Sequence, residues 1–282
     1  MIGFIDVGGG MKGIYTSGIY DYLMDKNIVP EYCIGVSAGS ANLITYIAGQ
    51  RGRTYRFYYD YAFEKEYMSL DCYIKKGSFI DLDYIYSFIS NSTGKDPLCF
   101  EQIEKSKCIF RAVATDATTG KPFYFKKSDF YRDDYSVLKA SCAIPIVCKP
   151  IEIKEKFYFD GGVSDPVPYK RAFADGCDRV VVCLTNPVDF VKKQMPKAVH
   201  AFLTMYPETA KALLAMNEKY NKAIKELTEL EKQGKALIIA PKQSYRIKTL
   251  TRDKERLELL YHAGYADARK IEEFIKNGSA FC

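Results

Sequence analysis

The sequence predicts an α/β protein built on a mainly parallel central sheet with helices on both faces. Short apolar runs bounded by glycine or polar residues alternate with longer segments whose apolar residues recur at helical spacing. The chain opens in the order strand, helix, strand, helix, and strands joined through helices pair in parallel. With 282 residues, of which 48% are apolar and 27% charged, the chain can bury a sizeable core.

The first two strand–helix pairs are predicted from apolar periodicity and from the residues that end each segment. The run IGFIDV reads as a buried strand because it is short, apolar and bounded by glycines. The following segment repeats apolar residues at helical spacing and ends near Asn27 and Pro30. The predicted elements are a strand over residues 2–7, a helix over 12–27, a strand over 32–36 and a helix over 38–49.

Residues 51–100 differ from the rest of the chain in their content of aromatic residues. Eight tyrosines and four phenylalanines precede Ser92, and we predict two or three amphipathic helices here. Two interpretations stay open. The rings pack against the sheet, or the segment is a partly mobile helical cover over a pocket, since tyrosine combines apolar area with a polar tip.

The sheet resumes after residue 107, and strands again alternate with helices. One predicted helix ends at Pro145, because proline disrupts a helix interior. No repeat or linker interrupts the chain, so we expect a single domain over residues 1–282, with residues 200–282 as a helical C-terminal extension. The remaining predicted elements are strands over 108–116, 123–127, 156–160, 179–186 and 236–241, and helices over 135–145, 207–234 and 253–276.

Charge and cysteine content exclude several function classes. The formal net charge is +6, and basic residues are interspersed with acidic ones, as on a solvated helix face. We therefore expect no nucleic-acid partner, although an anionic substrate or a membrane surface stays compatible with this charge. The nine cysteines include no CxxC pair, so no zinc site is indicated. Reduced, buried thiols predict a cytoplasmic protein.

Two segments bear on targeting to a membrane. The N-terminal apolar run contains Asp6 and no basic leader, so it does not resemble a signal peptide. Residues 32–50 carry no charge and approach the length of a spanning helix, but Ser37, Asn42 and Thr45 interrupt them. A buried strand followed by a buried helix fits this segment better. We expect a cytoplasmic location, at most peripheral to a membrane, and make no prediction of the oligomeric state.

The sequence GVSAGS places Ser37 between Gly35 and Gly39, where a predicted strand gives way to a predicted helix. Strand, then G-x-S-x-G, then helix is the pattern of a nucleophile elbow, whose sharp turn requires small neighbours. The turn would place Ser37 at a helix N-terminus, with the N–H of Ala38 as an oxyanion donor. The alternative is an ordinary turn that needs small residues.

A glycine run at Gly8, Gly9 and Gly10 follows the first strand. Glycine lets backbone N–H groups approach a shared site, because no Cβ blocks them. With Gly13, the run also fits G-x-G-x-x-G, the dinucleotide fingerprint. That pattern requires an acidic residue at the end of the second strand, which this chain lacks, and Ile14 after Gly13 rules out a Walker A motif.

A serine nucleophile needs a base, and neither histidine is placed for that role. His200 and His262 both lie in amphipathic helical patterns rather than in a loop. Asp160 is the alternative: it ends an apolar strand just before Gly161 and Gly162, so its carboxylate would emerge at the edge of the sheet where sites assemble. An Asp-Gly-Gly turn without a function is the other interpretation.

Taken together, the blocks GGGMKG (8–13), GVSAG (35–39) and DGG (160–162) resemble, in order and at comparable spacing, the signature motifs of the patatin-like phospholipases. The segment KASCAIP (139–145) and the tail LYHAGYADARK are also similar to that family, so the resemblance covers most of the chain. One departure is that the acidic residue often found directly before the glycine run is Val7 here, with Asp6 one place earlier.

The resemblance implies a three-layer α/β/α fold and a Ser37–Asp160 dyad that hydrolyses acyl esters of lipids without histidine, metal or cofactor. It implies an oxyanion hole at Gly8, Gly9, Gly10 and Ala38, and Lys12 as either an anion contact or a solvated surface lysine. The expected partner is therefore a lipid or other acyl ester, with transient contact to a membrane surface. Two alternatives stay open: a nucleotide-binding module, and a catalytically idle protein with a membrane-associated or regulatory role.

Overall fold

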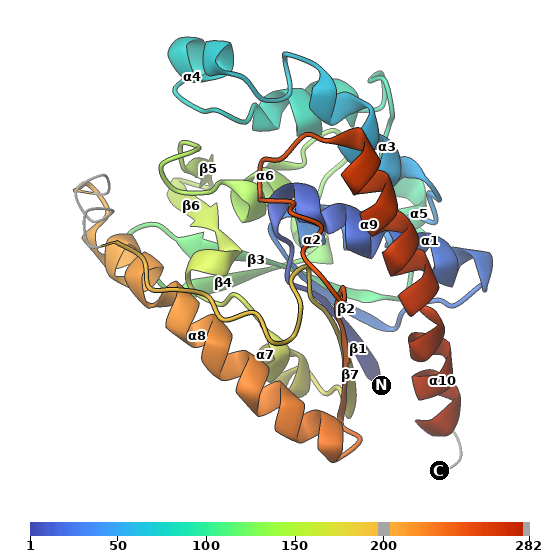
Figure 1. Ribbon diagram of the computed structural model, residues 1–282. Coiled ribbons are helices and arrows are strands. Elements are labelled where there is room, and N and C mark those ends of the chain that lie inside the picture. The colour runs from blue at the N-terminus through green and yellow to red at the C-terminus, as the bar shows by residue number, and fades with distance from the viewer. Residues whose placement is uncertain (197–203, 279–282) are drawn as a thin grey trace.

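A central sheet with helices on both faces organises the protein (Figure 1). The structure, a computed structural model, describes residues 1–196 and 204–278. Within them the sheet has eight strands in the order β5-β6-β3-β2-β1-β7-β8, and β4 pairs with β3 off this path. The strands are β1 (Ile2–Asp6), β2 (Tyr32–Val36), β3 (Ile109–Asp116), β4 (Pro122–Lys126), β5 (Ile151–Ile153), β6 (Lys156–Asp160), β7 (Arg179–Cys183) and β8 (Ala236–Ile239).

The predicted mainly parallel sheet is confirmed, and the strands at one edge of it pair antiparallel. The pairs β1–β2, β1–β7, β2–β3 and β7–β8 are parallel. The pairs β3–β4, β3–β6 and β5–β6 are antiparallel. In the register, Asp6 lies opposite both Gly35 and Cys183, so β1, β2 and β7 end at the same edge of the sheet.

Successive strand residues point to opposite faces and enter two separate cores. Phe4 and Cys33 pack with α1, α2, α6 and α9, whereas Ile5 and Ile34 pack with α7 and α8. This is the predicted three-layer α/β/α arrangement. The helices are α1 (Ile14–Asp25), α2 (Ala38–Ile47), α3 (Arg53–Tyr59), α4 (Leu70–Lys76), α5 (Phe100–Lys105), α6 (Ser136–Cys142), α7 (Tyr169–Ala174), α8 (Pro207–Lys232), α9 (Lys254–Asp267) and α10 (Arg269–Gly278).

Two elements differ from the sequence-based expectation. The predicted closing helix over 253–276 is divided at Ala268, where an Ile271 N–H to Ala268 carbonyl bond of 2.9 Å tightens the chain and both side chains become fully buried. Strand β5 was not predicted, because it has three residues and its hairpin turns at Lys154 and Glu155, which adopt positive φ without glycine. The predicted strand over 236–241 is confirmed as β8, which pairs with β7.

The aromatic segment 51–100 forms short helices over one end of the molecule. They are α3, a 3₁₀ turn η2 (Tyr61–Phe63), α4 and a π-helical segment η3 (Tyr84–Ile89). Several of its rings, among them Phe57, Tyr58 and Tyr86, line an internal cavity. The segment thus lies over a cavity, and its role as a partly mobile cover stays a prediction.

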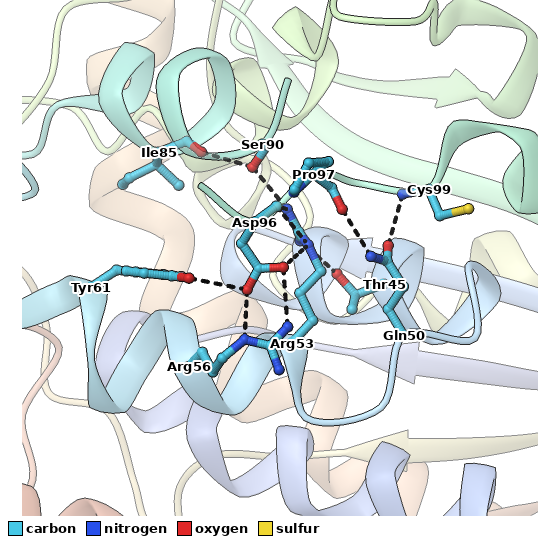
Figure 2. Close-up of polar contacts among 10 residues, drawn as sticks. All are labelled: Thr45, Gln50, Arg53, Arg56, Tyr61, Ile85, Ser90, Asp96, Pro97 and Cys99. Atoms are coloured by element: carbon cyan, nitrogen blue, oxygen red, sulfur yellow. Dashed lines mark hydrogen bonds and ion pairs between the residues drawn. The ribbon is translucent and has the colours of Figure 1, made fainter. Parts of the chain in front are cut away.

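A buried ion-pair network anchors this cover (Figure 2). Asp96 receives two hydrogen bonds from the Arg56 guanidinium, at 2.6 and 3.0 Å, and lies 3.5 Å from Arg53 Nε. The Arg53 side chain also donates to Thr45 on α2 at 3.2 Å and to Ser90 at 2.9 Å. Arg53 and Asp96 are 5% and 7% exposed, so neither charge has water as an alternative partner.

Replacing Asp96 by alanine is expected to lower the free energy of unfolding by about 3 kcal/mol, because it leaves the Arg53 charge buried without its counter-ion. Urea unfolding measures the change. Asp71→Ala is the matched control, since Asp71 pairs with Lys75 on the surface at 3.3 Å and exposed pairs contribute little. Equal stability of the two variants would show that the network does not anchor the cover.

Candidate active site

Ser37 lies at the sharp turn between β2 and α2, as the sequence predicts. Its backbone has φ 56° and ψ −134°, a conformation that residues with a side chain rarely adopt. A Cβ on Gly35 would meet the Ser40 backbone nitrogen at 2.5 Å. One on Gly39 would meet an Asp6 carboxylate oxygen at 2.6 Å. Both glycines are therefore required by close approach of the chain.

The hydroxyl of Ser141 on α6 fastens this turn to the sheet. The Ser37 N–H donates to Ser141 Oγ at 3.0 Å, and Ser141 Oγ donates to the Val113 carbonyl of β3 at 2.7 Å. Ser40 Oγ lies 2.8 Å from the same hydroxyl. Because Ser141 is fully buried, these bonds hold the nucleophile candidate in a fixed orientation.

Asp160 reaches the site by a route that the sequence did not predict. Strand β6 is antiparallel to β3, so Asp160 does not sit at the carboxyl edge of a parallel strand. Its register partner is Ala114, next to Val113, which pairs with the residue before Ser37. The chain then turns away at Gly161, where a Cβ would meet the Val113 carbonyl oxygen at 2.2 Å.

The structure places Ser37 and Asp160 in the lining of the same pocket. The Gly162 N–H donates to Asp160 Oδ1 at 2.8 Å, and Asp160 is 6% exposed. Burial raises the pKa of Asp160 to about 6, while the nearby Ser37 hydroxyl, the Gly162 N–H and the positive charge of Lys192 act in the opposite direction.

The glycine run forms a loop against the Ser37 turn. Gly8, Gly9 and Gly10 have φ values of 65°, 133° and 60°, which favour glycine. The Gly8 N–H, however, donates to Asp6 Oδ1 at 2.9 Å. Gly8 is therefore not an oxyanion donor, because its N–H is already bonded to Asp6. The remaining candidate donors are the N–H groups of Gly9, Gly10 and Ala38. Ala38 is the first residue of α2, so its N–H has no acceptor within the helix.

Asp6 holds this loop from beneath. Its carboxylate accepts from the Gly8 N–H and from the Tyr20 hydroxyl, the latter at 3.1 Å, and it is fully buried. Burial raises the pKa of Asp6 to about 6. On the other side, Thr185 donates to the Gly8 carbonyl at 2.5 Å. The loop is thus fixed between β1 and the end of β7.

Ser37 stands where two pockets meet. Beneath the 51–100 cover lies a narrow, mainly apolar cavity of about 80 Å³, with walls that include Phe57, Tyr58 and Ile85. On the other side is a wider pocket of about 230 Å³, lined by Asp160 and Lys192 as well as by Ser37. The first is the apolar cavity and the second the open pocket. The two spaces give different chemical surroundings to the two sides of a molecule bound at Ser37.

The remaining predicted residues have distinct positions. Lys12 is half-buried, its Nζ donates to Asn186 Oδ1 at 2.7 Å, and burial lowers its pKa. It is thus not an ordinary solvated lysine. His262 is exposed on α9 and lines neither pocket. His200 lies outside the described residues.

The chain belongs to the patatin-like phospholipase family, whose model matches residues 7–173. This membership supports lipid acyl hydrolysis as the class of activity. A second family model, of a domain of unknown function named DUF6363, matches residues 206–278. No helix in the described parts of the chain combines the length and the apolar character needed to cross a bilayer.

Among relatives, the uncharacterized protein YjjU of Escherichia coli K12 is 29% identical over 199 residues, which cover 66% of this chain and 52% of that protein. The uncharacterized NTE family protein Mb1092c of Mycobacterium bovis is 31% identical over 84 residues, which cover 30% of this chain and 22% of that protein. The part of each relative that matches this chain is thus about half of that relative's length or less. VipD from Legionella pneumophila superposes with a TM-score of 0.46 at 12% identity, over 95% of this chain and 66% of that one.

The raised pKa of Asp160 predicts a dependence of stability on pH. The folded chain binds this proton more tightly than the unfolded chain does, whose Asp pKa is about 3.9. The free energy of unfolding therefore falls as pH rises from below 4 through about 6, by about 3 kcal/mol in total for this group. The loss is complete above about pH 7.

Asp160→Asn removes this destabilising charge, so its stability advantage over the wild type is expected to grow between pH 5 and pH 8. Urea unfolding at both pH values measures the difference. Asp189→Asn, at an exposed position of the loop after β7, is the matched control and should show no such growth. An Asp160→Asn protein less stable than the wild type at pH 8 would contradict the assignment of a costly buried carboxylate.

Proposed function

We propose that this protein is a serine hydrolase that cleaves carboxylic esters of lipids through Ser37 and Asp160. The observation that carries the proposal is that Ser37 and the buried Asp160 line the same pocket, and that Ser37 also borders the apolar cavity. A carboxylate with a pKa near 6 is ionised at neutral pH, yet is more basic than an ordinary aspartate. It is therefore suited to accept the proton of the serine.

In the proposed reaction, Asp160 accepts the hydroxyl proton while Ser37 Oγ attacks the ester carbonyl carbon. The oxygen of the tetrahedral intermediate accepts hydrogen bonds from the N–H groups of Gly9, Gly10 and Ala38. The bond to the leaving alcohol then breaks, and Asp160 returns the proton to the alcohol oxygen. Water, deprotonated by the same carboxylate, attacks the acyl-serine, releases the fatty acid and restores both groups.

The two pockets support a lipid as the substrate. The apolar cavity, bordered by rings of the aromatic cover, suits an alkyl chain, since burial of each methylene is favourable by about 0.8 kcal/mol. The open pocket lies on the side of Asp160 and suits the leaving alcohol. Exposed apolar side chains flank it, with Ile146 on its wall and Phe190 and Val191 on the loop that bears Lys192. We infer that this rim makes transient contact with a lipid surface.

Ser37→Ala and Asp160→Asn are each expected to lower kcat/KM for a p-nitrophenyl acyl ester by on the order of 10³-fold or more, because the two groups act as one unit. A fluorophosphonate probe should label the wild type and leave Ser37→Ala unlabelled. His200→Ala and His262→Ala are controls that should keep the activity. An unlabelled and inactive wild type would favour the catalytically idle alternative, and loss in a histidine variant would overturn the dyad.

The pH profile tests the role of Asp160 separately. Because only the carboxylate accepts a proton, kcat/KM for a neutral ester should be constant above about pH 7 and should fall as the pH drops through about 6. Steady-state rates between pH 4.5 and 8.5, on a substrate that does not itself ionise, provide the measurement. A midpoint near 4 would mean that the essential carboxyl is not buried as described.

A further inference from the structure

A segment from the C-terminal part of the chain lies against the candidate active site. This C-terminal strap, residues 240–253, joins β8 to α9 and runs from the sheet to the aromatic cover (Figure 1). It falls within residues 206–278, which match the domain of unknown function, and outside residues 7–173, which match the patatin-like model. Any role of the strap at the site would therefore be a role of the C-terminal region.

The strap contacts the glycine loop through Thr249. The Met11 N–H donates to the Thr249 carbonyl at 2.9 Å. A Cβ on Gly10 would overlap the same carbonyl oxygen and would approach Thr249 Cγ2 to 2.6 Å, so the backbone of the loop packs directly on Thr249. Because Gly10 is a candidate oxyanion donor, the strap constrains the loop that would hold the oxyanion.

Contacts with the core and with the cover hold the strap in place. Ile247 is 4% exposed and packs in the core beside α1 and α2. Arg252 Nη1 donates to the carbonyls of Ala62 and Met68 in the cover, at 3.5 and 3.4 Å. The helix α9 that follows packs closely on α1, because Gly264 lets the two backbones touch. The strap is thus a fixed bridge between the glycine loop and the cover.

Leu250 stands at the mouth of the apolar cavity. Thr249, like Ser37, lines both the cavity and the open pocket, whereas Leu250 lines the cavity and not the open pocket. Leu250 is also 36% exposed, so it borders the cavity and meets solvent at the same time. An acyl group that is bound to Ser37 and extends into the cavity would therefore lie beside the strap.

We propose that the C-terminal strap completes the active site: Thr249 positions the glycine loop, and Leu250 limits the acyl groups that can enter the apolar cavity. This inference rests on the proposed function. It assigns the C-terminal region a part in turnover and selectivity, on the basis of its contacts with the loop, the cover and the cavity. In the alternative, the strap only connects β8 to α9, and its residues affect stability alone.

The test of Leu250 compares two esters that differ in acyl length, p-nitrophenyl acetate and p-nitrophenyl octanoate, below their aggregation concentrations. Leu250→Trp should lower the ratio of kcat/KM for octanoate over acetate about tenfold, because the larger side chain narrows the entrance that only the longer acyl group uses. Since both esters use the same dyad, the ratio cancels any effect of the substitution on Ser37 or Asp160.

Two further variants separate a specific effect at the entrance from a general effect on the fold. Leu250→Met has a similar volume and should retain most of the selectivity. Leu259→Trp is the matched control, because Leu259 is exposed on α9 and lines neither pocket, and it should leave the ratio unchanged. An unchanged ratio in Leu250→Trp, or an equal loss for both esters, would overturn the role of Leu250.

The positioning role of Thr249 is measured by its separate effects on kcat and KM. Thr249→Gly removes the methyl group that packs on Gly10 and should lower kcat about tenfold for both esters with little change in KM, since oxyanion donors act mainly in the transition state. Thr249→Val keeps that methyl group and should retain most of kcat. An unchanged kcat in Thr249→Gly would show that the strap does not position the loop.

A binding measurement keeps the inference testable if the wild type hydrolyses neither ester, an outcome that would refute the proposed function alone. Decanoate should raise the Tm of the wild type and of Leu259→Trp by occupying the apolar cavity, and should raise that of Leu250→Trp much less. No rise in the wild type, or an equal rise in Leu250→Trp, would overturn the assignment of Leu250 to the cavity entrance.

Discussion

The burial of one carboxylate, that of Asp160, beside the Ser37 turn imposes a cost on the whole fold. An ionised aspartate shielded from water destabilises the folded chain, and the hydrogen bond from the Gly162 N–H, together with the nearby Ser37 hydroxyl, offsets only part of that cost. The same burial raises the pKa of Asp160 and makes it a better base. A site of this kind persists only where the surrounding structure leaves its two groups no alternative position.

The sheet supplies that constraint through β3. Its residue Val113 pairs with the end of β2, receives the Ser141 hydroxyl that also holds the Ser37 N–H, and lies against Gly161 where β6 turns away. One backbone position thus fixes the surroundings of both Ser37 and Asp160, the two residues of the proposed dyad. A second buried carboxylate, Asp6, fixes the glycine loop in a similar way, by accepting the Gly8 N–H and packing against the helix that follows Ser37. Its pKa is also raised by burial, so the site contains two costly carboxylates with different tasks.

Local patterns predicted the parts of this architecture that depend on local physics. Apolar periodicity and glycine placement were enough to predict the parallel sheet and the turn at Ser37. For residues 51–100, aromatic content left two interpretations open. The antiparallel approach of β6 was not predictable, because sheet pairing between distant segments leaves no local signal. The same holds for Ser141, whose bonds to Ser37 and Val113 depend on which elements pack beside it. The bond from the Gly8 N–H to Asp6 likewise depends on the geometry of the glycine loop, which the sequence pattern does not specify.

The ionisation of Asp160 itself tests the central claim most directly. Carbon-13 NMR of protein labelled at aspartate carboxyl groups follows it, with the resonance assigned by its absence in Asp160→Asn, because Asp6 titrates in the same range. The account predicts a midpoint near pH 6 in the wild type and a higher one in Ser37→Ala, where the carboxylate loses the nearby hydroxyl that favours its charged form. A midpoint near 4, or one that does not respond to removal of the Ser37 hydroxyl, would contradict a buried carboxylate beside the serine.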